Sequence, residues 1–241
     1  MILFDNDYYL NTTQHIAAWI IGGFLVGWGT KMANGCTSGH GVCGLPRLAP
    51  RSLIAVPTFM AAGIAMATLR YNLDFLYGGP NFGTEYIKVW KWIAFAIILG
   101  FNAYSLLLIL KQTSSRKELG LSYLIGALFG LGLTISGMCR VSKILGFLTL
   151  NSNWDPSLMF VMMSAVTINF FTFKNILSQP KPKEAEKFAF AKTGVIDAKL
   201  VIGSIIFGFG WGLSGLCPGP GAVLMFTKSE GILWVISLAL G

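Results

Sequence analysis

Long apolar segments without charged residues constrain this chain more than any other feature. A helix that crosses the hydrocarbon core of a bilayer needs about 17–25 mostly apolar residues. Six segments reach that length, at residues 14–30, 52–69, 92–110, 119–139, 156–173 and 200–217. Only 12% of the 241 residues are charged and 54% are hydrophobic, whereas soluble domains carry about 25% charged residues. The sequence therefore predicts an all-α membrane protein, a multi-pass helical bundle in the cell (inner) membrane.

The ends of the chain and its loops indicate an orientation. Residues 1–13 are polar and acidic and contain no Lys or Arg, unlike the basic start of a signal peptide. The final apolar run, residues 231–241, is either a half-helix or a span whose end is missing. Loops on the inner side of a membrane carry an excess of Lys and Arg, and this bias favours an outside N-terminus. Basic loops also account for the formal net charge of +8, so we expect no nucleic-acid partner.

Polar connections divide the chain into two halves. The first half, residues 1–111, contains about three spans and a re-entrant loop at residues 34–45. The second half, residues 119–241, contains spans at about 119–139, 156–173 and 200–217, followed by a re-entrant or partial span. Within it, residues 178–197 are rich in Pro and Lys and are typical of an exposed cytoplasmic linker.

The loop at residues 34–45, Asn-Gly-Cys-Thr-Ser-Gly-His-Gly-Val-Cys-Gly-Leu, suits neither a lipid-facing helix nor a solvent loop. It combines four glycines, two thiols, two hydroxyls and one imidazole, and it has no charged residue. Irregular backbone at membrane depth is tolerated only where it is buried in protein or lines a polar cavity. We expect a solute path here, with Thr37 or Ser38 as the N-cap of a short helix whose free N–H groups attract anions. His40 either donates to that anion or bonds to the backbone at the helix break.

A pattern of Gly-x-Gly-x6-Cys occurs three times, at residues 27–36, 130–139 and 208–217. Each copy ends an apolar span and predicts a helix break after the cysteine, which gives the bundle pseudo-symmetric repeats with re-entrant half-helices. Glycine at this density lets membrane helices pack closely, so each span is expected to contact a neighbour through its glycine face. Broken helices at corresponding positions of a repeat indicate a transporter site. The alternative is that the glycines only pack and the cysteines are inert apolar residues.

The residues of this path favour a soft anion. Cys is a weak, polarisable donor, and a transported ion must be bound weakly enough to leave. The candidate path residues are Cys36, Cys217, Cys139, Gly35, Thr37, Ser38, Gly39, His40, Pro218 and Gly219. We expect no metal and no cofactor. The chain has no P-loop motif for ATP hydrolysis, and its spans lack the carboxylates of a proton relay.

Several strings resemble the YeeE/YedE family of sulfur-compound transporters. Gly-Trp-Gly-Thr at 27–30, Asn-Gly-Cys-Thr-Ser-Gly-His-Gly at 34–41 and residues 45–52 resemble the family signature. Residues 126–158 and 210–220 look like a companion protein of that family, so the chain resembles a fusion of two short partners. The resemblance implies thiosulfate import through cysteines on short re-entrant loops. That role falls on Cys36 and Cys217, whereas Cys139 and Cys43 depart from the family pattern.

We therefore predict an uptake permease for a small sulfur oxyanion, with thiosulfate first among the candidates, that uses helix-end dipoles and a cysteine thiol relay. It is not expected to be an enzyme. Two alternatives remain open: a membrane sulfur-transfer or redox protein that uses its cysteines covalently, and a non-transporting scaffold subunit. The expected partners are the sulfur oxyanion and the lipid bilayer. A cytoplasmic sulfurtransferase-type partner at residues 178–197 and a homo-oligomer are left open.

Overall fold

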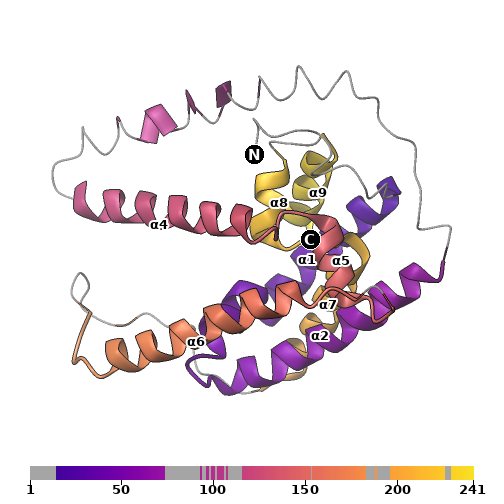
Figure 1. Ribbon diagram of the computed structural model, residues 1–241, viewed down its shortest axis with the longest axis horizontal. Coiled ribbons are helices and arrows are strands. Elements are labelled where there is room, and N and C mark those ends of the chain that lie inside the picture. The colour runs from indigo at the N-terminus through magenta and orange to yellow at the C-terminus, as the bar shows by residue number, and fades with distance from the viewer. Residues whose placement is uncertain are drawn as a thin grey trace.

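The computed structural model describes residues 15–73, 116–152, 154–182, 196–225 and 229–241, with Phe188 and scattered positions between 93 and 107. Within these ranges the chain is helical and has no strand. Figure 1 shows the elements α1 (Ile16–Ala33), η2 (Thr37–Gly44), α2 (Pro50–Tyr71), α4 (Arg116–Ile135), α5 (Val141–Leu148), α6 (Ser157–Leu177), α7 (Ala198–Ser214), α8 (Pro218–Leu224) and α9 (Ser229–Leu240).

Five of the described helices are long and apolar enough to cross a membrane: α1, α2, α4, α6 and α7 with its extension to Leu224. This confirms the predicted helical membrane fold. The predicted span at 92–110 is described only at scattered positions, all of them helical, whereas residues 1–13 and most of the linker at 178–197 lie outside the described residues. The last run forms α9, a helix of 12 residues.

The described helices follow one order three times: a long helix, a short helix and a second apolar helix. The three units are α1–η2–α2, α4–α5–α6 and α7–α8–α9. In each, the residue two positions before the cysteine has a positive φ: 56° at Asn34, 71° at Gly137 and 65° at Gly215. A left-handed residue ends an α-helix because the next N–H groups turn away from the helical ladder. The helix break therefore lies before each repeated cysteine, rather than after it as the sequence pattern suggested.

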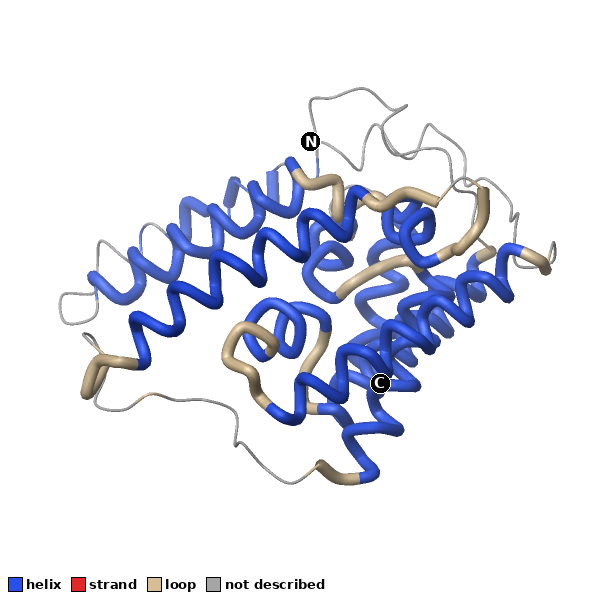
Figure 2. Tube along the Cα trace, turned by 60° about the horizontal axis from the view of Figure 1, so that its bottom comes forward, coloured by secondary structure: helices blue, strands red, loops and turns tan. Residues whose placement is uncertain are grey.

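Helix α7 packs against both α1 and α2. Figure 2 shows that the described chain consists of helices and the loops that join them. Arg51 near the start of α2 pairs with Asp197 at the start of α7, at 3.5 Å. At the other end, Arg70 Nη1 donates to the Leu213 carbonyl at 3.1 Å. Helices α2 and α7 therefore run parallel. Arg70 is 2% exposed, so its guanidinium belongs to the helix packing.

Glycines allow α7 to pack closely against α1 and α2. A Cβ atom added at Gly208 would lie 2.5 Å from the Phe59 carbonyl of α2, and one added at Gly210 would lie 2.7 Å from the Gly22 carbonyl of α1. Helix α4 differs, because a Cβ at Gly126, Gly130 or Gly132 would meet no described atom within 4 Å. The expected glycine contacts are thus present on α1 and α7, whereas the glycine face of α4 meets no described partner.

Candidate functional site

The short helices of the first and third units, η2 and α8, meet at their N-terminal ends, where Cys36 and Cys217 are the N-cap residues. Thr37 Oγ1 donates to Cys217 Sγ at 3.4 Å, across 180 positions of the sequence. Both side chains are buried. Helix η2 leads from this contact to the start of α2, while α8 follows the opposite end of α7. Two interrupted segments that reach in from opposite ends of α7 therefore touch through one hydroxyl and one thiol.

Two of the three repeated cysteines lie in one packed cluster. Cys217 belongs to the buried core, Cys36 packs against that core, and Cys139 is buried as well. The Cys36 sulfur and the Ser38 hydroxyl share a hydrogen bond at 3.2 Å. These thiols are free, as is Cys43, which is exposed on the far part of η2. The Gly-x-Gly-x6-Cys repeat thus places Cys36 and Cys217 in one cluster, whereas Cys43 is exposed.

Helix η2 is a wide π-type turn. Its backbone includes a bond from the Leu45 N–H to the His40 carbonyl, five residues back, at 2.9 Å. Its N-cap is Cys36, which makes no side-chain capping bond. The prediction that Thr37 or Ser38 caps this helix is therefore wrong. Their hydroxyls form hydrogen bonds with the sulfurs of Cys36 and Cys217 instead, so these side chains do not cap the helix end.

The His40 side chain bridges the break between α1 and α2. Its Nε2 lies 3.2 Å from the Ala33 carbonyl and its Nδ1 lies 3.0 Å from Ser52 Oγ. A carbonyl can only accept, so Nε2 carries a hydrogen and donates to it, and in the neutral ring Nδ1 accepts from the Ser52 hydroxyl. Gly35 makes room for the ring, since a Cβ there would lie 2.7 Å from it. This geometry favours the backbone-bonded interpretation of His40 over a direct bond to the anion.

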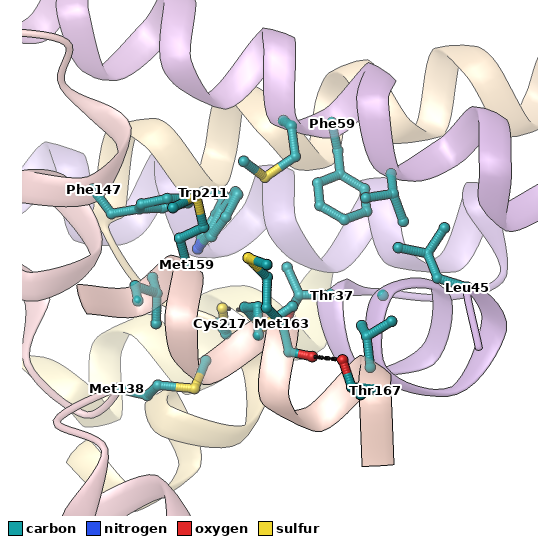
Figure 3. Close-up of a pocket in the computed structure, with 16 residues that line it drawn as sticks. Thr37, Leu45, Phe59, Met138, Phe147, Met159, Met163, Thr167, Trp211 and Cys217 are labelled. Atoms are coloured by element: carbon teal, nitrogen blue, oxygen red, sulfur yellow. Dashed lines mark hydrogen bonds between the residues drawn. The ribbon is translucent and has the colours of Figure 1, made fainter. Parts of the chain in front are cut away.

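Two cavities flank the contact between Thr37 and Cys217. The first, of about 400 Å³, lies among α2, η2, α6 and α7 (Figure 3). The second, of about 440 Å³, lies among α4, α6, η2 and α8. Neither has a charged residue in its lining. Both cavities are lined by Thr37, Met138, Met162 and Cys217.

The other predicted path residues divide between the cavities and the surrounding structure. Ser38, Pro218 and Gly219 line the second cavity. The remaining five, which line neither cavity, are Gly35, Cys36, Gly39, His40 and Cys139.

The start of α8 offers few free N–H groups. Proline has no N–H, so at the first three positions of α8 only Gly219 carries one, between Pro218 and Pro220. An anion attracted by helix-end N–H groups therefore finds more of them at the start of η2, where Thr37, Ser38 and Gly39 each carry one.

Sequence reasoning missed the methionines and one tryptophan of this site. The first cavity is lined by Met60, Met138, Met159, Met162 and Met163. The indole N–H of Trp211 also lies near the Cys217 sulfur, outside hydrogen-bond geometry. Met162 and Met163 follow Met159 by three and four residues, so the three side chains are neighbours on the surface of one helix. This spacing was the signal in the sequence that could have pointed to them.

An ion pair closes the turn before α6. Lys143 Nζ donates to Asp155 Oδ2 at 2.6 Å, and Asp155 Oδ1 accepts from the Ser157 N–H at 2.9 Å. The hydrogen bonds from Lys143 and Ser157 lower the pKa of Asp155 to about 2. The charge of Lys143 in α5 is therefore paired with the Asp155 carboxylate from the turn between α5 and α6.

Comparison with known proteins gives two matches along one chain. A family model described as sulphur transport matches residues 8–66. A second model, a family of unknown function (DUF6691), matches residues 118–241. No solved structure matches the chain.

The curated relatives that this chain matches are named probable transporters. A probable transporter of Xylella fastidiosa (strain Temecula1) is 41% identical over 118 residues, which are 48% of this chain and 80% of the relative. A probable transporter of strain 9a5c is 51% identical over 55 residues, 22% of this chain and 41% of the relative. Two models on separate parts of one chain are consistent with a fusion of two partners. The chain therefore belongs to this family of sulfur transporters, with a sulphur-transport region followed by a DUF6691 region, and is a membrane transporter rather than an enzyme.

Proposed function

We propose that this transporter takes up a small sulfur oxyanion, thiosulfate, along a path that passes the contact between Thr37 and Cys217. The observation that carries the proposal is this contact, an uncharged meeting point of two interrupted helices with a cavity on either side. Transport requires binding sites that an ion can leave as readily as it enters, and a charged side chain in the lining would hold a dianion too firmly.

The donors at this point suit the two ends of thiosulfate. A hydroxyl hydrogen rotates freely, so the Thr37 hydroxyl can turn from the Cys217 sulfur towards an oxygen of the anion. The thiols of Cys217, Cys36 and Cys139 are weak, polarisable donors and suit the terminal sulfur. The N–H groups at the start of η2 supply the positive end of a helix dipole. Successive thiols then pass the anion on without a covalent bond.

Uptake of radiolabelled thiosulfate into proteoliposomes tests the proposal. Cys217→Ala and Cys36→Ala remove the proposed relay, and Cys43→Ala is the matched control because Cys43 is exposed and, unlike Cys36 and Cys217, is not part of the packed core cluster. We expect the first two variants to lose most of the initial rate and the control to keep the parent rate. Parent-like rates for both relay variants would exclude the thiol relay. A stable sulfur adduct on Cys217, seen by mass spectrometry during turnover, would favour covalent sulfur transfer instead.

A further inference from the structure

Four residues are shared by the linings of the two cavities. Thr37 comes from η2, Met138 from the turn between α4 and α5, Met162 from α6 and Cys217 from the turn before α8. They are the residues that line both cavities, and we call this set the septum. These four side chains therefore border a direct route from one cavity to the other within the described structure.

Helix α6 is placed to divide the two spaces. Met159 and Met163 line the first cavity alone, whereas Ser164 and Ala165 line the second cavity alone. Met162 lies between these faces and lines both. Its methyl carbon rests against η2, because a Cβ added at Gly41 would lie 3.2 Å from Met162 Cε. The tip of Met162 therefore fills the space that the missing side chain of Gly41 leaves open.

We propose that Met138 and Met162 are specificity-determining residues, which let thiosulfate pass the septum and exclude sulfate. This inference rests on the proposed function. Both anions carry two negative charges and differ in one terminal atom, sulfur in thiosulfate and oxygen in sulfate. The distinction must therefore come from what the septum offers to that atom.

Thioethers make the distinction because they donate no hydrogen bond. Of the four septum side chains, only those of Thr37 and Cys217 have a hydrogen to donate. An anion oxygen pressed against Met138 or Met162 loses its water without a replacement donor, which is costly. A terminal sulfur is soft and weakly hydrated, and it gains dispersion contacts with the polarisable thioethers. Methionine also has three rotatable bonds, so its side chain can move aside as the anion passes.

Substitutions that preserve volume test the chemistry of the thioethers. Leucine replaces methionine with little change in volume but removes the sulfur. We expect Met162→Leu and Met138→Leu each to lower the apparent affinity for thiosulfate about tenfold, as expected for the loss of one specific contact in a tight site. Met66→Leu is the matched control, since Met66 is half-buried on α2 and lines neither cavity. Parent-like affinity in both septum variants would overturn the proposal.

A gain of sulfate binding gives the sharper result. Met162→Gln keeps a side chain of similar length and adds an amide donor. We expect unlabelled sulfate to compete with radiolabelled thiosulfate in this variant and not in the parent. Sulfate competition in the parent, or its absence in Met162→Gln, would contradict a selection by thioethers.

A second readout does not depend on any substrate. The rate at which methyl methanethiosulfonate modifies Cys217, followed by peptide mass spectrometry on the full chain, reports how closely the septum covers that thiol. Gly41→Ala pushes Met162 and should lower the rate several-fold, and Met162→Ala should raise it. Gly130→Ala is the matched control, because nothing lies within 4 Å of a Cβ at Gly130 and this glycine lines neither cavity. Unchanged rates in both variants would exclude the septum. If these substitutions change the rate of Cys217 modification but the parent protein takes up no thiosulfate, the septum is supported and the proposed function is refuted.

Discussion

The Thr37 hydroxyl links the short helices of the first and third units, and its role can be separated from its volume. Thr37→Val keeps the shape and removes the donor to Cys217 Sγ. One hydrogen bond is worth about 0.5–1.5 kcal/mol, so we expect the initial rate of thiosulfate uptake to fall about 2–10-fold. Thr37→Ser keeps the hydroxyl and should retain most of the rate. Equal rates for Thr37→Val and the parent would show that the hydroxyl takes no part in transport.

The Asp155 carboxylate gives a prediction about pH. Its pKa is lowered to about 2 by Lys143 and Ser157, so the pair contributes its full stability above the pKa of the unfolded carboxyl, about 4. That contribution is lost only as the pH falls through about 2. Asp155→Asn should therefore lower the stability by the same amount at every pH between about 5 and 8.

The size of this loss is small because the pair is partly exposed, with side-chain exposures of 35% for Lys143 and 31% for Asp155. We expect about 0.2–1 kcal/mol, measured as a shift of the thermal unfolding midpoint in detergent. Lys143→Gln is the companion variant and should show a similar loss. A loss for Asp155→Asn that varied between pH 5 and 8 would mean that another group titrates with the pair.

At the scale of elements, the glycines of α7 and α4 have opposite expected effects. Gly208→Ala places a methyl group against the Phe59 carbonyl of α2, and overpacking of this kind costs about 1–3 kcal/mol. Gly130→Ala on α4 meets no described atom within 4 Å and should raise helix stability by about 0.5–1 kcal/mol. Thermal unfolding of both variants in the same detergent measures the contrast. Destabilisation by Gly130→Ala would reveal a contact of α4 outside the described residues.

At the scale of the whole molecule, the two matched regions interlock. Helix α7 belongs to the DUF6691 region, yet it lies between α1 and α2 of the first region. We predict that fragments 1–114 and 115–241, expressed together, copurify and restore uptake. Each fragment alone should fail, because the glycine faces of α1 and α7 would lack their partners. Transport by the second fragment alone would show that the first region is not part of the path.

Much of the fold could be predicted from local chemistry. The uncharged segments locate α1, α2, α6 and α7 to within a few residues, because helix length in a bilayer depends on apolar content. The repeat pointed to three helix breaks. It could not place them before the cysteines, since that depends on which residue adopts the left-handed conformation, and in one unit this is Asn34 rather than a glycine.

The candidate site was less accessible from the sequence. The cysteine repeat singled out Cys36, Cys139 and Cys217, of which Cys36 and Cys217 lie in one packed cluster. The methionines gave a weak signal, because a methionine in an apolar helix is ordinarily a packing residue. His40 could equally have faced a solute, and its two bonds to Ala33 and Ser52 follow from how η2 folds back.

By itself the sequence determined the helical membrane class, the sulfur-transporter family and the recurrence of a broken helix beside a cysteine. These properties follow from apolar length, glycine spacing and local backbone preference. Only the tertiary structure decided that Thr37 meets Cys217 and that Met138 and Met162 line both cavities. Contacts between residues so far apart depend on how α7 packs between α1 and α2, and local sequence does not encode that arrangement.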